Sequence, residues 1–248
     1  TVNLGECTPG TTVYIHIRPV DNAGNIGEEF VQEIEIPDNE SYFDLPYALF
    51  ASEEEVQLFC CQADVKGIVY GNETFRFQGS TLNLLGTAYS AGKLQIAGGD
   101  LHIAEKIENA SQIELPNYMT DILDNMKQNT GIEEIAEYNM ANVTNPTICK
   151  TTTRAWCNRV NIFADLVSNG DISFNANVMT LGYKDPVVIA SENGDITIQA
   201  TNVNGNGLIY APNGTVTINV CDFDYKGSII AKKINIQATY YQHKIEDK

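Results

Sequence analysis

The chain has 248 residues, 43% of them hydrophobic, and its 32 acidic and 15 basic side chains give a net charge of −17. This length suits one large domain or two smaller ones, and no run approaches the roughly 18 consecutive apolar residues of a membrane span, which we therefore exclude. Lysines and arginines do not cluster as a phosphate-binding surface requires, so no nucleic-acid partner is expected. The negative charge reads as a solvated surface and no cofactor is expected, with Ca²⁺ as the alternative because an acidic surface can gather divalent cations.

Residues 1–37 predict two β-strands joined by a turn. The apolar side chains of Val13, Ile15 and Ile17 recur at every second position, a second alternating run covers residues 30–36, and DNAGN at 21–25 reads as the turn between them. A period of two is typical of strands. We therefore expect a β-hairpin, followed by a short hinge at residues 38–40.

This hairpin resembles the last two strands of a fibronectin type III or bacterial Ig-like domain, whose pattern there is YxhxhxAxDxAGN. The resemblance covers residues 13–29. Such a domain has about seven strands, and two strands alone are marginally stable. The resemblance thus implies an incomplete domain at residues 1–37. Either the chain is a fragment of a longer protein, or the hairpin docks on the rest of the chain, or another chain completes it.

A repeat of nineteen residues begins at residue 49. The blocks are LFASEEEVQLFCCQADVKG, IVYGNETFRFQGSTLNLLG and TAYSAGKLQIAGGDLHIAE. Small residues able to turn a corner separate two apolar pairs in each block. The apolar residues fall into four columns: Val56, Phe75 and Leu94; Leu58, Phe77 and Ile96; Ala63, Leu82 and Leu101; Val65, Leu84 and Ile103.

The pattern returns after residue 160, in blocks of twenty residues from 188 and from 208. Asn-Gly turns stand at 169–170, 193–194 and 213–214. Matching positions are Ile196 with Val216, Ile198 with Ile218 and Val203 with Phe223, and partial blocks add Ile172, Phe174, Ile234 and Ile236.

This period predicts an all-β fold, a parallel β-helix with coils of about 19–20 residues. One coil cannot bury its inward side chains alone, so coils stack and bury them as ladders. A leucine-rich repeat would need an LxxLxL frame that these blocks lack. An antiparallel sandwich also has short strands, but it would not give column-by-column matches at a fixed period.

A helical and irregular insertion is expected at about 106–160 of the domain that spans residues 38–248. PNYMTDILDNMKQNTG reads as a helix whose apolar stripe is formed by Tyr118, Met119, Ile122, Leu123 and Met126. IEEIAEY is compatible with a second short helix, and residues 139–160 are polar and irregular. We expect the stripe to pack on a flank or an end of the coils.

The repeats at 49–105 and 166–242 resemble right-handed parallel β-helices of bacterial surface proteins, of the bactofilin-like polymer-forming group and of pectin-lyase-like repeats. GLIYAPNGTVTIN followed by GSIIAKKINI carries the resemblance best. It implies the fold and an extracellular or scaffold use. The resemblance does not identify any catalytic residues in this chain.

One outward face offers a candidate ligand site. Asp222 and Asp224 should both point outward beside inward Phe223, and Asn202 and Asn204 occupy the same columns one coil earlier. These side chains could bind a sugar or Ca²⁺, or supply the paired carboxylates of glycoside hydrolysis. The alternative is a solvated polar face.

Trp156 and two cysteines are further candidates. Trp156, the only tryptophan, could form an aromatic platform for a sugar, or cover an open end or flank of the stack. Cys149 and Cys157 bracket a short polar segment, which suits a disulfide in an oxidising compartment. Neither a CxxC pair nor clustered histidines occur, so no metal site is predicted. The acidic run 53–55 reads as a solvated corner, with Ca²⁺ binding as the alternative.

We therefore expect a non-enzymatic structural module of a secreted or cell-surface protein or appendage. It would serve as a spacer, in adhesion, or in fibre assembly by stacking or strand completion. Its expected partners are other copies of itself or neighbouring Ig-like domains. The alternative is a carbohydrate-active β-helix enzyme or a polysaccharide-binding protein that uses an outer face of the coils. No GxSxG, HExxH, phosphate-loop or EF-hand spacing occurs.

Overall fold

The computed structural model describes residues 12–17, 27, 30–35, 45–128, 132–136, 141–182 and 185–245. The chain divides into two compact units, Thr1–Ser41 and Tyr42–Lys248. In the first, β1 (Thr12–Ile17) and β2 (Phe30–Glu35) pair antiparallel, from Thr12 with Glu35 to Ile17 with Phe30. Two antiparallel strands are what the alternating pattern predicts. The turn at 21–25 and the hinge at 38–40 lie outside the described residues.

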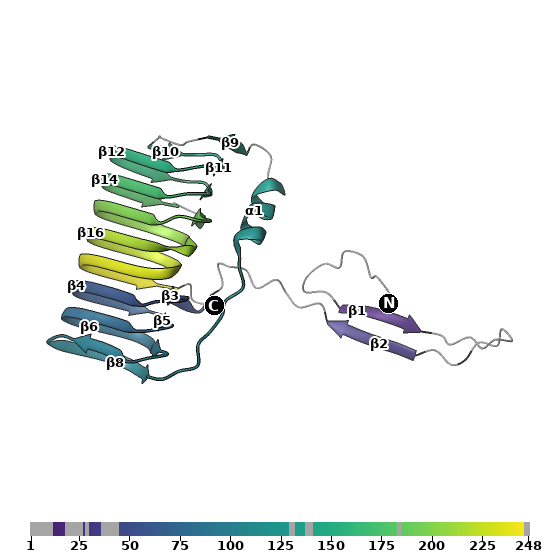
Figure 1. Ribbon diagram of the computed structural model, residues 1–248, viewed down its shortest axis with the longest axis horizontal. Helices are drawn as coiled ribbons and strands as arrows, with labels where there is room; N and C mark the ends of the chain where they lie inside the picture. Colours follow the sequence, from purple (N-terminus) through teal and green to yellow (C-terminus); the bar gives the residue numbers. More distant parts are fainter. Residues whose placement is uncertain are drawn as a thin grey trace. The chain divides into compact units, whose positions relative to one another are not determined.

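The second unit is a sheet of 14 strands, and every pairing between its strands is parallel. It is drawn as a stack in Figure 1. Its elements are β3 (Tyr47–Ala51), β4 (Val56–Lys66), β5 (Ile68–Gly71), β6 (Phe75–Ser90), β7 (Leu94–Ala97), β8 (Asp100–Ile107), α1 (Met119–Gln128), β9 (Glu133–Ile135), β10 (Asn142–Val143), β11 (Thr147–Cys149), β12 (Thr153–Ile162), β13 (Leu166–Ser168), β14 (Ile172–Leu181), β15 (Val187–Ser191) and β16 (Ile196–Lys244).

The predicted apolar columns are register ladders of this sheet. Val56 pairs with Phe75, and Phe75 with Leu94, as the nineteen-residue period requires. The other three columns are also in register. Side chains of these columns form the main apolar core, where those of Phe75 and Phe77 are fully buried. We call each segment that pairs in register with the next a layer. An all-β fold of parallel strands is thus established, and it is compatible with the predicted β-helix.

The layers are not stacked in chain order. The last layer of β16 pairs with β4, and residues 229–231 pair with β3, so segments far apart in the chain lie side by side. In Figure 1 the yellow end of β16 lies directly beside β4. We call this junction the seam; it joins an N-terminal half (β3–β8) to a C-terminal half (β9–β16). Its register pairs include Ile234 with Val56, Ile236 with Leu58, Tyr241 with Ala63 and His243 with Val65.

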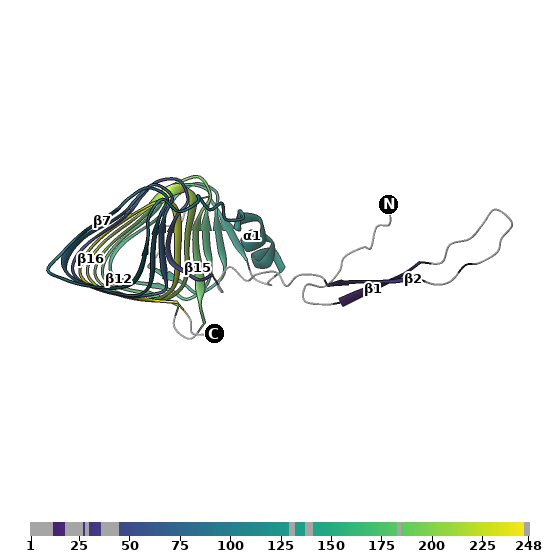
Figure 2. The same ribbon diagram turned by 90° about the horizontal axis from the view of Figure 1, so that it is seen from below.

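Residues 108–128, which we call the strap, lie in the chain between the two halves. The strap leaves β8 at one end of the stack and carries α1 on the outside of the layers, on the side of β15 (Figure 2). The predicted helix is confirmed, and Asn117 Oδ1 accepts a hydrogen bond from Met119 N (3.0 Å) at its start. The buried side chains of Tyr118, Met119, Ile122 and Met126 pack with Phe50, Tyr70, Val188, Leu208, Tyr210 and Ile230.

The structure differs from the predicted insertion at 106–160. From β9 onward the strands that the structure describes belong to the sheet: β9, β11 and β13 pair in sequence, and β12 pairs with β14 over most of its length. IEEIAEY contains strand β9 rather than a helix. Large apolar side chains are scarce in these layers because small or polar residues such as Thr147, Thr153 and Ala155 occupy buried positions. The apolar pattern is therefore hard to see in the sequence.

Candidate functional site

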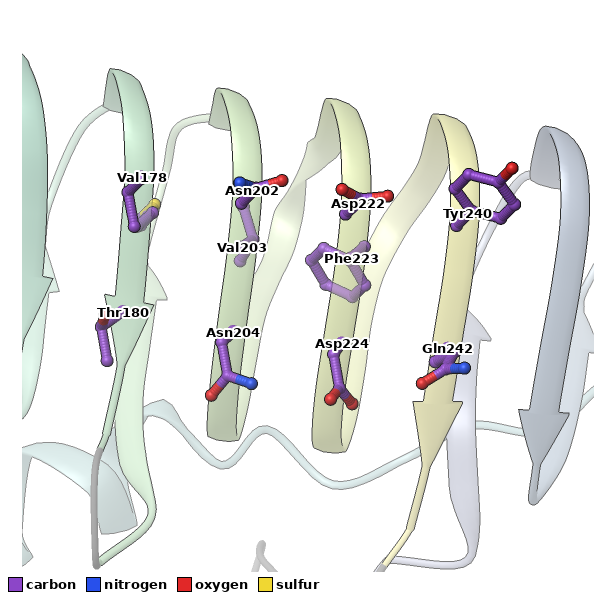
Figure 3. A pocket seen from close by; sticks show the side chains of 11 residues that line it. Val178, Thr180, Asn202, Val203, Asn204, Asp222, Phe223, Asp224, Tyr240 and Gln242 are labelled. Atoms are coloured by element: carbon purple, nitrogen blue, oxygen red, sulfur yellow. The ribbon is translucent and has the colours of Figure 1, made fainter.

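Four of the five predicted ligand-binding residues line one depression, of about 440 Å³, on the outside of the stack (Figure 3). We call it the polar groove. All of its lining residues belong to β14 and β16. Residues at every second position of a strand face the same side, so Asn202 and Asn204 share a face, as do Asp222 and Asp224. Its lining residues are Val178, Met179, Thr180, Asn202, Val203, Asn204, Asp222, Phe223, Asp224, Tyr240 and Gln242.

Asp222 and Asp224 point outward and the Phe223 ring is buried between them, as the spacing predicts. With its amide turned so that Nδ2 faces the carboxylate, Asn202 donates to Asp222 Oδ2 at 2.8 Å. The layer spacing of about 4.8 Å brings side chains of one column within hydrogen-bond reach. The groove therefore presents one carboxylate, that of Asp222, which an amide of the neighbouring layer already engages.

Amides separate the carboxylates along one column of the groove. Asn204, Asp224 and Gln242 follow one another in successive layers of β16 (Figure 3), and Gln242 pairs across the seam with Asp64. Asp64 is next to Asn83, whose Nδ2 donates to it at 3.3 Å. A second depression of about 190 Å³ adjoins the groove and shares Asp224 and Gln242 with it. Like charges in this column are kept two layers apart, which limits their repulsion.

Trp156 lies elsewhere. Its side chain is 75% exposed on β12, so it does not cover an end of the stack. It lines a separate depression of about 450 Å³ together with Asn158, Asn175 and Asn177, and none of these residues lines the polar groove. Asn177 Nδ2 donates to Asn158 Oδ1 at 2.6 Å. The structure therefore does not bring Trp156 together with the other four candidates.

The predicted Cys149–Cys157 disulfide is not formed. Both cysteines are free: Cys149 is buried and its thiol donates to Thr152 O (3.1 Å), while the thiol of Cys157 donates to Arg159 O (2.9 Å). The physical reason is that the chain turns a corner between β11 and β12. The two side chains therefore belong to different sides of the layer.

The acidic run 53–55 is part of the seam. Glu53 forms an ion pair with Lys232 (3.2 Å), and Lys233 forms ion pairs with Glu54 (3.4 Å) and Glu55 (3.2 Å). These carboxylates therefore have protein partners. Among the described residues, no group of three or more His, Cys, Asp or Glu side chains could hold a metal ion.

Sequence reasoning missed a buried polar pair beside the seam. The Tyr241 hydroxyl lies 2.6 Å from His243 Nδ1, and His243 Nε2 lies 2.9 Å from Gly227 O. A carbonyl can only accept, so Nε2 carries the proton and Nδ1 accepts from the hydroxyl. Burial lowers the pKa of His243 to about 4. The sequence signal for this pair was that Tyr241 and His243 stand two positions apart, at inward positions of a strand near the end of the repeats.

No family model, no curated protein and no solved structure matches this chain. Within the described ranges, no helix is both long enough and apolar enough to cross a bilayer.

Proposed function

We propose that this chain is a non-enzymatic structural module of an extracellular surface protein or appendage, built as a right-handed parallel β-helix. In this proposal the stack is a stiff spacer or display element of the bactofilin-like or pectin-lyase-like kind. The β1–β2 hairpin belongs to an Ig-like or fibronectin type III-like domain and joins the stack to Ig-like neighbours.

The observation that carries this proposal is the register that neighbouring layers share, with shifts only between Tyr47 and Leu49 and between Leu84 and Thr87 among the strand pairs that the structure describes. Apolar ladders continue from β12 through β14, β16, β4 and β6 to β8, across the seam. Each inner layer forms backbone hydrogen bonds with a layer on either side, so bending the stack must distort many of them together. Such a rod holds attached domains at a set distance, which suits a spacer.

The open end at β7 and β8 supports assembly with other copies. Within the part of the chain that the structure describes, both strands pair with β6 alone, and their inward side chains Leu94, Ile96, Leu101 and Ile103 are only partly buried. Exposed strand edges are ready templates for pairing with another chain. We therefore expect end-to-end association of copies.

Sedimentation over a concentration series, with electron microscopy of the same samples, tests this function. Filaments or larger species should form in the wild type and disappear in Ile96→Lys, which puts a charge on the open edge. Trp156→Lys, on another exposed position, is the matched control. A strictly monomeric wild type at high concentration contradicts fibre assembly. Cleavage of any member of a polysaccharide panel, lost in Asp222→Ala, contradicts the non-enzymatic role.

The polar groove favours a second candidate, polysaccharide binding. Its amides and carboxylates can hydrogen-bond sugar hydroxyls, and the Tyr240 ring, 54% exposed, offers a stacking surface. Binding on a glycan array should be lost in Asp222→Ala and Asp224→Ala and kept in Glu192→Ala, a control outside the groove. Repeating the array with a chelator tests a role for Ca²⁺. Binding that survives both groove substitutions contradicts this candidate.

A further inference from the structure

The seam is held by matched features of the two halves. The large inward rings of Tyr241 and His243 on the C-terminal side face Ala63 and Val65 on the other. At one corner of the seam, ion pairs of residues 53–55 with Lys232 and Lys233 join the two halves. Each half therefore presents an edge that is complementary to the other half and would be left unpaired without it.

The strap is anchored on both sides of the seam. On the N-terminal half, Asn72 exchanges two hydrogen bonds with Ile113: its Nδ2 donates to Ile113 O (2.9 Å) and its Oδ1 accepts from Ile113 N (3.1 Å). On the C-terminal half, Tyr118 N donates to the Tyr210 hydroxyl (3.1 Å). Residues 114–116 connect these anchors without helix or strand structure.

This connection between the anchors is short. The anchoring layers are those of Tyr70 and Tyr210, and the layers of Phe50 and Ile230 lie between them. Three layer steps amount to about 14 Å. The anchored residues are Ile113 and Tyr118, and the five residue steps between them reach at most about 17 Å when fully extended. Short hinge loops with little slack favour domain swapping, because an opened chain can close on a second copy and keep every other contact.

We propose that two copies of this chain associate by exchanging halves at the seam, with residues 114–116 as the hinge. In the exchanged dimer, β16 of each copy pairs with β4 of the other, and both strap anchors are kept. The hinge length then places the two stacks side by side with their strapped faces adjacent. This association differs from end-to-end stacking because it closes at two copies.

The order of synthesis favours this exchange. The N-terminal half is complete before β16 is made, so its β4 edge is open while the chain is being finished. A tether of this kind gives the chain's own β16 an effective concentration on the order of millimolar. When copies are held close together on a surface or in an assembly, the β16 strand of a second copy competes with the chain's own β16 for the open β4 edge.

Interchain disulfides test the exchange. Gln57 and Asn235 are register partners across the seam, and their spacing of about 4.8 Å lies in the range that a disulfide spans. One tagged chain carries Gln57→Cys and a differently tagged chain carries Asn235→Cys, both with Cys61→Ser and Cys221→Ser. The chains are mixed unfolded and refolded together from about 1 µM to about 1 mM. They are also co-expressed, so that the outcome does not depend on refolding.

We expect a covalent heterodimer of twice the 27.3 kDa chain mass, which increases with concentration. Its yield should fall several-fold when Gly-Ser-Gly-Ser is inserted between Leu115 and Pro116, which slackens the hinge. Thr197→Cys in place of Asn235→Cys is the control, because it lies on the same face but away from the seam. The proposal is overturned if neither refolding nor co-expression yields more heterodimer than this control, while the double variant Gln57→Cys/Asn235→Cys forms its disulfide within one chain.

Discussion

Acid should weaken the stacked unit through His243. The imidazole is buried inside the last layer, with Tyr241 and Gly227 as its hydrogen-bond partners. The rings of Phe223 and Tyr225 pack against it from the preceding layer. The charged residues that line the adjoining depression together with His243 are Asp64, Lys66, Asp224 and Lys244. A proton on Nδ1 would turn it from an acceptor into a donor inside the core.

The size of the effect follows from the pKa difference. The ordinary pKa of histidine is about 6.5 and that of His243 in the fold is about 4. The unfolded chain therefore takes up the proton first, so the stabilisation is complete above pH 6.5 and is lost as the pH falls toward 4. The total loss is about 3 kcal/mol, of which about 2 kcal/mol is expected by pH 5.

Urea unfolding of the wild type and of His243→Gln, at pH 7.5 and pH 5, measures this loss. The Gln amide can still donate to Gly227 and accept from Tyr241, while it cannot be protonated. Carboxylates titrate in both proteins, so their effect cancels in the comparison. The wild type should lose about 2 kcal/mol more than the variant. Equal losses, or an imidazole that titrates near 6.5 by NMR, would refute the reasoning.

Three further substitutions test the packing. Ile122→Ala removes a fully buried strap side chain and should lower the free energy of unfolding by about 2–4 kcal/mol, whereas exposed Asp124→Ala should change it by less than about 0.5 kcal/mol; equal effects contradict the docking of α1. Gly79→Ala would place a methyl group 1.8 Å from a backbone oxygen of the next layer and should abolish soluble expression, whereas Gly99→Ala, with 3.3 Å to its nearest atom, should express normally. Lys233→Met should cost up to about 1 kcal/mol in urea unfolding at low salt and less at high salt; a salt-independent cost contradicts an ion-pair contribution.

The apolar columns were predictable because burial acts at each layer separately. Val56, Phe75 and Leu94 recur at one spacing because each must face the interior of its own layer. The α1 stripe was visible for the same reason, since a helix that packs on one face repeats its apolar residues every three to four positions. Layers with small inward residues, such as Ala155 and Thr153, lack this signal and were assigned to the insertion.

The candidate site was predictable only in part. That Asp222 and Asp224 share a face follows from the period of two along a strand. That Asp64 and Asp224, far apart in the chain, line one depression beside the groove depends on the seam. The spacing of Cys149 and Cys157 could not show that a corner lies between them, so the predicted disulfide was wrong.

By itself, the sequence determined the inward side chains and the turns of the layers that carry large apolar residues, and which segment forms the helix, because these follow from local alternation and composition. Only the tertiary structure decided the order of the layers. Repeats with the same register have interchangeable edges, so local pattern cannot say which edge meets which. The order of the layers is set by contacts between residues far apart in the chain. The strap packs across the layers, and the large Tyr241 side chain on one side of the seam meets the small Ala63 side chain on the other.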